Sequence, residues 1–292
     1  MKLRLRILLP IMAVILLVGC RNQNTSQIVA TTRPVYQFTS ILCQGTDLKV
    51  GLLVTENVSC LHDYTLQVRQ MKAIEKAELL IINGAGLEAF LHDIMPADTP
   101  IIDCSKGIPL ICHGAADEEH TEHEHAHEAD PHIWMDITNA KQMAQNICSG
   151  LIQTYPQYAS VFQKNLDRLN GEFSAIMDLA KLELTEPSCK EMLTFHDGFS
   201  YLAQCFGLNI LAAIEEESGS EASAAELIEM IQLVQDNGLP AIFVETNGSV
   251  SAASIIQSHT GVQIFTLDMC MSDRGYFDAM RHNIQVLKEA LQ

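Results

Sequence analysis

Short apolar, strand-like runs alternate with helical patterns along almost all of the 292 residues, and this alternation restricts the fold more than any other feature. In the first half of the chain the runs lie at 28–31, 48–54, 78–84 and 99–105. In the second half they lie at 190–195, 208–214, 240–246 and 262–268. Strands that are joined by helices form parallel sheets with helices on both faces. The sequence therefore predicts an α/β fold with two sets of parallel strands.

One uninterrupted helical pattern separates the two sets of strands. It begins near Pro156, a residue type that suits a first helical turn, and it stops at Pro187. A helix of roughly 28 residues spans about 40 Å at 1.5 Å per residue. A packing helix that is kinked at Gly171 is the alternative. We predict two Rossmann-like lobes with parallel sheets, at 27–155 and 187–292, joined by one long rigid helix at 156–186.

The N-terminus has the pattern of a secretory signal. Lys2, Arg4 and Arg6 precede an apolar run, Ile7–Val18, which is too short to span a membrane comfortably. The following "LVGC" resembles the bacterial lipobox, in which the peptide is cut before the cysteine and the thiol carries a diacylglycerol. We predict a lipoprotein signal peptide at 1–19, lipidation of Cys20, a polar tether at 20–26, and a lipid-anchored location on the extracytoplasmic face of the cell membrane. An ordinary N-terminal anchor helix is the alternative.

The overall charge is strongly acidic. The chain has 36 Asp and Glu against 18 Lys and Arg, and its formal net charge is −18. This balance argues against nucleic acid as a partner and favours attraction of cations. Because 48% of the residues are hydrophobic, the chain can still bury a core and is not a disordered acidic protein.

Nucleotide binding and thiolate metal sites have no support in the sequence. No GxGxxG or GxxxxGK turn is present. The cysteines that follow Cys20 are scattered without a CxxC pair, so a zinc site of the finger type is not expected. Their even number permits disulfides, but the sequence does not choose a pairing.

The segment at 113–130 is unusually rich in histidine and acid. Starting at His113, twenty residues contain six histidines and seven carboxylates, with no lysine or arginine. No apolar pattern could fold this segment, so a disordered acidic linker is one interpretation. The other is loose, exchangeable coordination of cations, which should weaken as the pH falls through about 6.5 because only neutral imidazole binds metal. The histidines expected to take part are His120, His123, His125 and His127.

Three other histidines and two carboxylates lie near the ends of predicted strands. His62 and His196 follow strands, whereas His132 precedes a helix. Asp268 and Glu245 lie at strand ends in the second half, and ligands bind beyond the carboxyl ends of strands in open α/β sheets. Each residue alone could be a hydrogen-bonded surface residue or a helix cap. Three neutral imidazoles and one carboxylate, however, complete a tetrahedral shell that suits Zn²⁺.

The order of four motifs extends this interpretation. They are "HDYTLQVRQMKAIEKAELLIINGAGLEAFL", "DPHIWMD", "FHDGFSYLAQCFGL" and "LDMC". With them the chain resembles the metal-binding solute-binding proteins of zinc and manganese ABC importers, over nearly the whole mature length. The resemblance implies two α/β lobes bridged by one rigid helix, with the metal in the cleft between them. It also implies that the segment at 113–130 is the His- and acid-rich insertion of zinc-type members.

The resemblance implies a ligand set as well. His62 and His132 match the ligands of the first lobe, His196 the third ligand, and Asp268 the acidic position of the second lobe. A nitrogen ligand at His196 favours Zn²⁺ over Mn²⁺, which prefers oxygen. Some zinc members have a glutamate where Leu61 stands here, so the fourth ligand stays open between Asp268, water and a histidine of the 113–130 segment. "TLQVRQ" replaces the prolines and glutamate that often follow the first motif, which affects how the helix begins.

We therefore expect a monomeric binding protein, not an enzyme, that captures Zn²⁺ and hands it to an ABC importer permease in the membrane. Mn²⁺ is the alternative metal. A secreted zinc-dependent hydrolase, with Glu245 or Asp197 as general base, is a second hypothesis, although no GxSxG motif is present. An extracellular metal buffer or adhesin, which would depend on the His-rich segment alone, is a third. Because a rigid helix braces the lobes, we expect metal release to need only modest loop motion near His62, His196 or Asp268.

Overall fold

The structure is a computed structural model, and it describes residues 26–56, 64–92, 94, 98–112, 129–214 and 222–292. Several of the predicted features fall outside these ranges. They are the signal peptide at 1–19, Cys20, His62, and the four histidines His120, His123, His125 and His127. Within the described ranges, none of the helices has the length and apolar character needed to cross a membrane.

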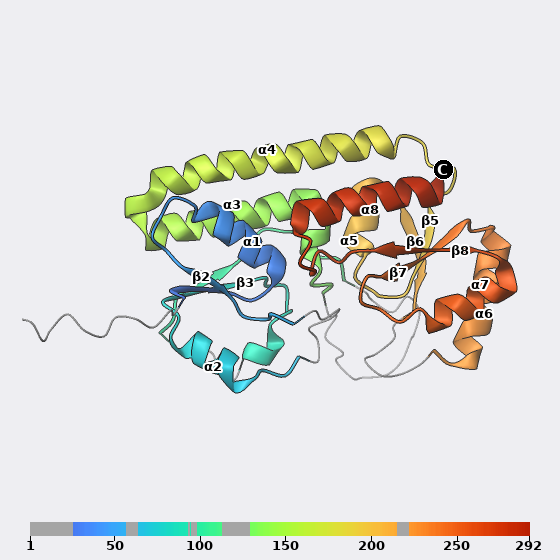
Figure 1. The fold of residues 1–292 in the computed structure, drawn as a ribbon, viewed down its shortest axis with the longest axis horizontal. Helices are drawn as coiled ribbons and strands as arrows, with labels where there is room; N and C mark the ends of the chain where they lie inside the picture. The colour runs from blue at the N-terminus through green and yellow to red at the C-terminus, as the bar shows by residue number, and fades with distance from the viewer. Residues whose placement is uncertain (1–25, 57–63, 93, 95–97, 113–128, 215–221) are drawn as a thin grey trace, which may run out of the picture.

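The first half of the chain forms a parallel sheet with the strand order β2-β1-β3-β4. Side chains that alternate along β1 and β3 point to opposite faces and enter two different cores. Figure 1 shows α1 and α3 over one face of this sheet and α2 on the other. The strands are β1 (Ile28–Ala30), β2 (Val50–Leu52), β3 (Leu79–Ile82) and β4 (Ile101–Asp103). The helices are α1 (Arg33–Leu42), α2 (Val68–Glu75) and α3 (Ile137–Thr154), with short 3₁₀ turns at Ala89–Leu91 and Ile133–Met135.

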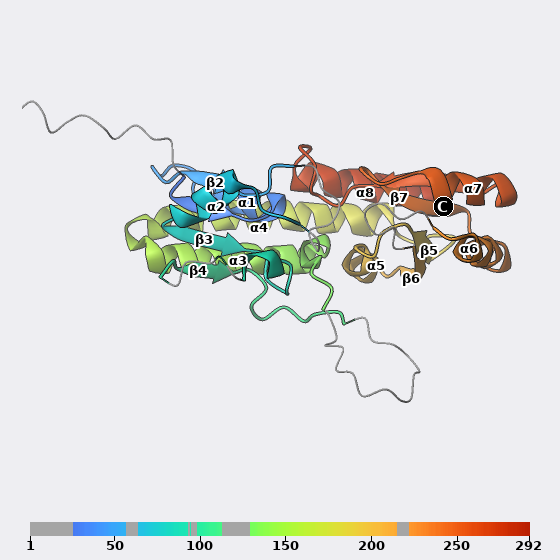
Figure 2. The same cartoon turned by 90° about the horizontal axis from the view of Figure 1, so that it is seen from below.

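The second half repeats this architecture with the strand order β6-β5-β7-β8, again all parallel. One face of the sheet packs against α6 and α7, and the other against α5 and α8. Figure 2 shows the two sheets next to each other, the first on the left and the second on the right. The strands are β5 (Glu191–Thr194), β6 (Asn209–Ala213), β7 (Ala241–Glu245) and β8 (Gln263–Leu267). The helices are α5 (Ser200–Phe206), α6 (Ala224–Asn237), α7 (Ser251–Thr260) and α8 (Tyr276–Leu291).

Helix α4 (Ala159–Glu183) runs along both halves, as Figure 1 shows. A 3₁₀ turn at Pro156–Tyr158 precedes it, and the helix then passes Gly171 without a break. Its buried Phe173 packs against Phe38 of α1, at a ring-centroid distance of 5.4 Å, and against Phe277 of α8, at 5.1 Å. Helix α4 therefore packs against a helix that covers the first sheet and against a helix that covers the second. This confirms the predicted fold of two parallel α/β lobes with a long helix along them.

Candidate metal site

His132 lies between β4 and α3, directly before the 3₁₀ turn at Ile133–Met135, and only 2% of it is exposed. Asp130 fixes its orientation. The Oδ1 atom of Asp130 accepts a hydrogen bond from the His132 backbone N–H at 2.8 Å and lies 2.8 Å from Nδ1 of the imidazole. When Nδ1 carries its proton toward this carboxylate, Nε2 is the nitrogen with a lone pair for a metal. The pair has the arrangement in which a carboxylate orients a ligating histidine.

Hydrogen bonds to the second half hold this segment in place. The Tyr201 hydroxyl, on α5, donates to the carbonyl of Asp130 and accepts from the backbone N–H of Ile111, both at 3.0 Å. The indole N–H of Trp134 donates to the carbonyl of Met269 at 2.8 Å. The residues on both sides of His132 are thus bonded to elements of the second half. Any wide separation of the two halves would break these bonds.

The first half holds the same segment through the loop after β3. The side-chain amide of Asn83 donates to the carbonyl of Pro131 at 2.9 Å. The buried carboxylate of Glu88 fixes that loop, because it accepts hydrogen bonds from Thr31 Oγ1 at 2.5 Å, from Asn83 N at 2.7 Å and from Gly84 N at 3.0 Å. Burial raises the pKa of Glu88 to about 7, although these three donors lower it.

His196 follows β5 closely and lies against His132. The centroids of the two imidazole rings are 5.3 Å apart, and the ring planes make an angle of 84°. Gly198 leaves room for this arrangement. A Cβ atom at Gly198 would lie 2.4 Å from Cε of Met269, 2.7 Å from Cδ2 of His196 and 3.0 Å from its Nε2. Any side chain at Gly198 would therefore displace Met269 or the His196 ring.

Asp268 comes directly after β8, and 1% of it is exposed. Asn283 of α8 fixes its backbone with two hydrogen bonds, of 2.8 Å to the N–H and 2.7 Å to the carbonyl. The carboxylate accepts from the backbone N–H of Cys270 on Oδ1 and from the Ser272 hydroxyl on Oδ2, each at 2.8 Å. The guanidinium Nε of Arg274 lies 3.6 Å from Oδ2.

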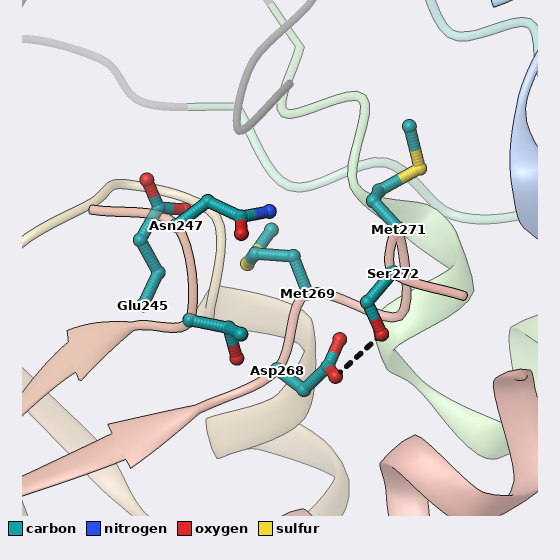
Figure 3. A pocket seen from close by; sticks show the side chains of 7 residues that line it. Glu245, Asn247, Asp268, Met269, Met271 and Ser272 are labelled. Carbon is teal, nitrogen blue, oxygen red and sulfur yellow. Dashed lines mark hydrogen bonds between the residues drawn. The ribbon is translucent and has the colours of Figure 1, made fainter. Parts of the chain in front are cut away.

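Figure 3 shows that Asp268 borders a small pocket at this edge of the second sheet. Glu245, the last residue of β7, lies on the opposite side of the pocket and is 8% exposed. The pocket is also lined by the thioethers of Met269 and Met271 and by the amide of Asn247. Oxygen and sulfur atoms therefore line the pocket beside Asp268.

The structure brings His132 and His196 together but does not complete a metal site from its described residues. Among those residues, no group of three or more His, Cys, Asp and Glu side chains is arranged to hold a metal ion. Both carboxylate oxygens of Asp268 have hydrogen-bonding partners in its own loop. His62 lies outside the described ranges, so the set of His62, His132, His196 and Asp268 stays a prediction.

Asp130, Tyr201 and Arg274 shape this site but were not among the residues predicted from the sequence. Asp130 stands two positions before His132, and a carboxylate so close to a candidate ligand is a signal that could have identified it. Tyr201 and Arg274 gave no such signal, because their contacts depend on how α5 and the loop after β8 are placed in space.

Comparison with known proteins decides the family. Residues 28–290 match the family model described as "ZnuA: Zinc-uptake complex component A periplasmic". The chain belongs to this family. The family description names a component of a zinc-uptake complex rather than an enzyme.

Two relatives of this family member are named for zinc. The zinc-binding lipoprotein AdcA of Streptococcus pneumoniae serotype 4 is 27% identical over 305 residues, which cover 98% of this chain and 60% of AdcA. The high-affinity zinc uptake system protein ZnuA of Bacillus subtilis is 26% identical over 304 residues, which cover 95% of this chain and 94% of the relative. The chain thus spans about 60% of the length of AdcA and nearly all of the Bacillus protein.

Solved structures agree with the fold. A crystal structure of ZnuA has a TM-score of 0.80 and 24% identity, with coverage of 91% of this chain and 100% of that one. The binding protein FpvC of Pseudomonas aeruginosa, in complex with Ni²⁺, has a TM-score of 0.77 and 22% identity, with coverage of 91% and 96%. These two likenesses concern the fold alone.

Proposed function

We propose that this chain is an extracytoplasmic solute-binding protein that captures Zn²⁺ and delivers it to the permease of an ABC importer. The observation that carries the proposal is the pairing of His132 and His196, with ring centroids 5.3 Å apart, in a member of a zinc-uptake family. A zinc ion about 2.0–2.1 Å from a ligating nitrogen lies about 3.2 Å from that ring's centroid, and two such rings at a tetrahedral angle have centroids about 5.2 Å apart. The spacing of the two histidines therefore suits one shared zinc ion.

The proposed ligands are His62, His132, His196 and, as the fourth, Asp268. Three nitrogens and one oxygen suit the borderline-soft Zn²⁺ better than Mn²⁺. The relatives AdcA and ZnuA carry zinc in their names, which supports the same metal. FpvC was solved with Ni²⁺, so a competition between metals belongs in the test.

The remaining parts of the proposal concern the anchor, the lobes and the His-rich segment. Cys20 would carry the lipid, and relatives named lipoproteins support this assignment. The lobes would be 27–155 and 187–292, joined by the helix at 156–186, in a monomer. His120, His123, His125 and His127 would collect cations loosely beside the tight site.

Metal release would proceed through small loop movements. The bonds of Tyr201 to Asp130 and of Trp134 to Met269 hold the His132 segment against the second half. Helix α4 packs along both halves. A large rotation of one lobe would have to break these contacts, so release would need only modest motion of loops near His62, His196 or Asp268.

Zinc titration of three variants tests the tight site. His196→Ala should lose it, and deletion of residues 113–128 should keep it while binding fewer weakly held ions. His259→Ala is the matched control, because it removes an exposed histidine on α7. Affinity is measured by competition with a chromophoric chelator, with and without excess Mn²⁺ or Ni²⁺. Loss of tight binding in the deletion alone would favour a metal buffer and would contradict the proposed site.

Delivery requires a separate measurement. Uptake of radioactive zinc is compared in cells that make the wild-type chain or the His196→Ala variant, together with the ABC importer permease that the proposal requires. The proposal expects zinc uptake at limiting concentration to fall with His196→Ala and to be restored by the wild-type chain. Equal uptake in both would contradict delivery even if zinc binds.

A further inference from the structure

The two carboxylate oxygens of Asp268 differ in the contacts that hold them. Oδ1 accepts from the backbone N–H of Cys270, so the local turn fixes it. Oδ2 is contacted by side chains, the Ser272 hydroxyl at 2.8 Å and the guanidinium of Arg274 at 3.6 Å. Figure 3 shows Oδ2 and its bond to Ser272 beside the pocket. Side chains can exchange partners more easily than a backbone turn can rearrange. Oδ2 is therefore the oxygen that can release its present partners and bind a metal ion.

Arg274 reaches this carboxylate from the surface. The side chain of Arg274 is 45% exposed, whereas that of Asp268 is 2% exposed. At 3.6 Å the contact is an ion pair without a direct hydrogen bond, so it supplies charge compensation with little geometric constraint. A buried carboxylate needs such compensation whenever no other cation is present. Partial exposure of the arginine keeps the attraction moderate.

The backbone around Arg274 is fixed even though its side chain is partly exposed. Its N–H donates to the Ser272 hydroxyl at 3.3 Å. The neighbouring Asp273 forms an ion pair with Arg33 at 2.5 Å, and Arg33 also donates to the carbonyl of Thr55 at 3.0 Å. This fixed loop keeps the guanidinium near Oδ2, so its return to the carboxylate is an intramolecular step.

We propose that Arg274 is the counter-cation of Asp268 in the metal-free protein and competes with the metal for Oδ2. Binding of Zn²⁺ exchanges one cation for another at this oxygen. When the ion leaves, Arg274 takes its place, so the buried carboxylate is never left without a positive partner. Arg274 thereby lowers the affinity for zinc and speeds its release. The inference rests on the proposed function, because it requires Asp268 to be the fourth ligand.

The test compares Arg274→Gln with a matched control. Arg281→Gln removes the same charge from a side chain that is 42% exposed and pairs with Asp278 and Glu172 on the outside of the helices. Equilibrium affinity is measured by chelator competition, and release by stopped-flow mixing of the zinc-loaded protein with excess chelator. We expect Arg274→Gln to bind zinc about three- to fivefold more tightly and to release it correspondingly more slowly. Arg281→Gln and the charge-preserving Arg274→Lys should stay within about twofold of wild type.

A second background separates the inference from the function on which it rests. In Asp268→Asn protein, Arg274→Gln should no longer change the affinity, because the carboxylate for which the two cations compete is gone. If Asp268→Asn weakens zinc binding but Arg274→Gln weakens it too or leaves it unchanged, the competition is refuted and the ligand assignment stands. If Asp268→Asn leaves the affinity unchanged, Asp268 is not a ligand and both statements fail. Thermal unfolding of each metal-free variant verifies that the fold is intact.

Discussion

Replacing Asp130 with asparagine should weaken zinc binding while the fold stays intact. The Oδ1 atom of Asp130 accepts from the backbone N–H of His132 and lies 2.8 Å from Nδ1 of its imidazole. An asparagine oxygen can accept the same two hydrogen bonds, so the orientation of the ring is kept. The negative charge is lost, however, and with it the increase in basicity that a carboxylate gives to a ligating imidazole.

The size of the effect follows from these contacts. Carboxylates that hydrogen-bond a metal-ligating histidine typically account for a 10–100-fold difference in metal affinity. Asp130→Asn keeps the bonds and removes the charge, so we expect a loss of about tenfold. Asp130→Ala also leaves the buried Nδ1–H and backbone N–H of His132 without this acceptor. It should cost about a hundredfold in affinity and about 1–3 kcal/mol in the free energy of unfolding.

The assay is chelator competition for Zn²⁺, together with urea unfolding of the metal-free protein. Asp47→Asn is the charge control, because Asp47 is exposed and its carboxylate accepts from the Tyr158 hydroxyl. It should leave zinc affinity within about twofold of wild type. Equal affinities of the Asp130→Asn, Asp47→Asn and wild-type proteins would refute the reasoning, since His132 would then not depend on its carboxylate partner as a metal ligand must.

Three further predictions concern the surroundings of the site. Gly198→Ala should weaken zinc binding and lower the melting temperature, because its Cβ would collide with neighbouring side chains. Its control is Gly171→Ala, whose Cβ would meet nothing within 4 Å and which should stabilise α4 by about 0.5–1 kcal/mol. Tyr201→Phe loses two hydrogen bonds and should lower the free energy of unfolding by about 1–3 kcal/mol. Its control is Tyr155→Phe, which should leave the free energy of unfolding nearly unchanged, because the buried Tyr155 hydroxyl has no hydrogen-bond partner among the described residues. Burial raises the pKa of Glu88 from 4.5 to about 7, so the folded state favours the protonated carboxyl group. As the pH rises through this range, the free energy of unfolding of wild type should therefore fall by roughly 3 kcal/mol relative to that of Glu88→Gln.

Each of these predictions has an outcome that contradicts it. Unchanged zinc affinity in Gly198→Ala would mean that the His196 ring need not stay where the structure places it. Equal unfolding free energies of the Tyr201→Phe and Tyr155→Phe proteins would show that the hydroxyl of Tyr201 does not stabilise the junction of the two halves. If urea unfolding of metal-free wild type and Glu88→Gln depended on pH in the same way from pH 4.5 to 7, the carboxyl group of Glu88 would not titrate there.

The fold could be predicted from the sequence because its signals are local. Apolar runs bounded by turn residues located the strands, and the uninterrupted pattern between Pro156 and Pro187 located α4. The ends differ by a few residues, since the first turn after Pro156 is a 3₁₀ turn and α4 begins at Ala159. Such boundaries depend on capping and packing contacts that the apolar pattern does not contain.

The candidate site could be predicted only in part. Positions after strands indicated His196 and Asp268, and the structure places His196 against His132. The partners that tune these residues come from distant elements, as Tyr201 does, or from a loop whose path the sequence does not define, as Arg274 does. Long-range contacts of this kind follow from the tertiary arrangement, so no pattern of spacing along the chain could have identified them.

Anomalous diffraction at the zinc absorption edge, from crystals of the mature chain loaded with one equivalent of Zn²⁺, tests the central claim most directly. We expect a single strong peak between the two halves, about 2.0–2.1 Å from a ring nitrogen of each of His62, His132 and His196 and at a similar distance from a carboxylate oxygen of Asp268. A strong peak that touches neither His132 nor His196 would contradict the account.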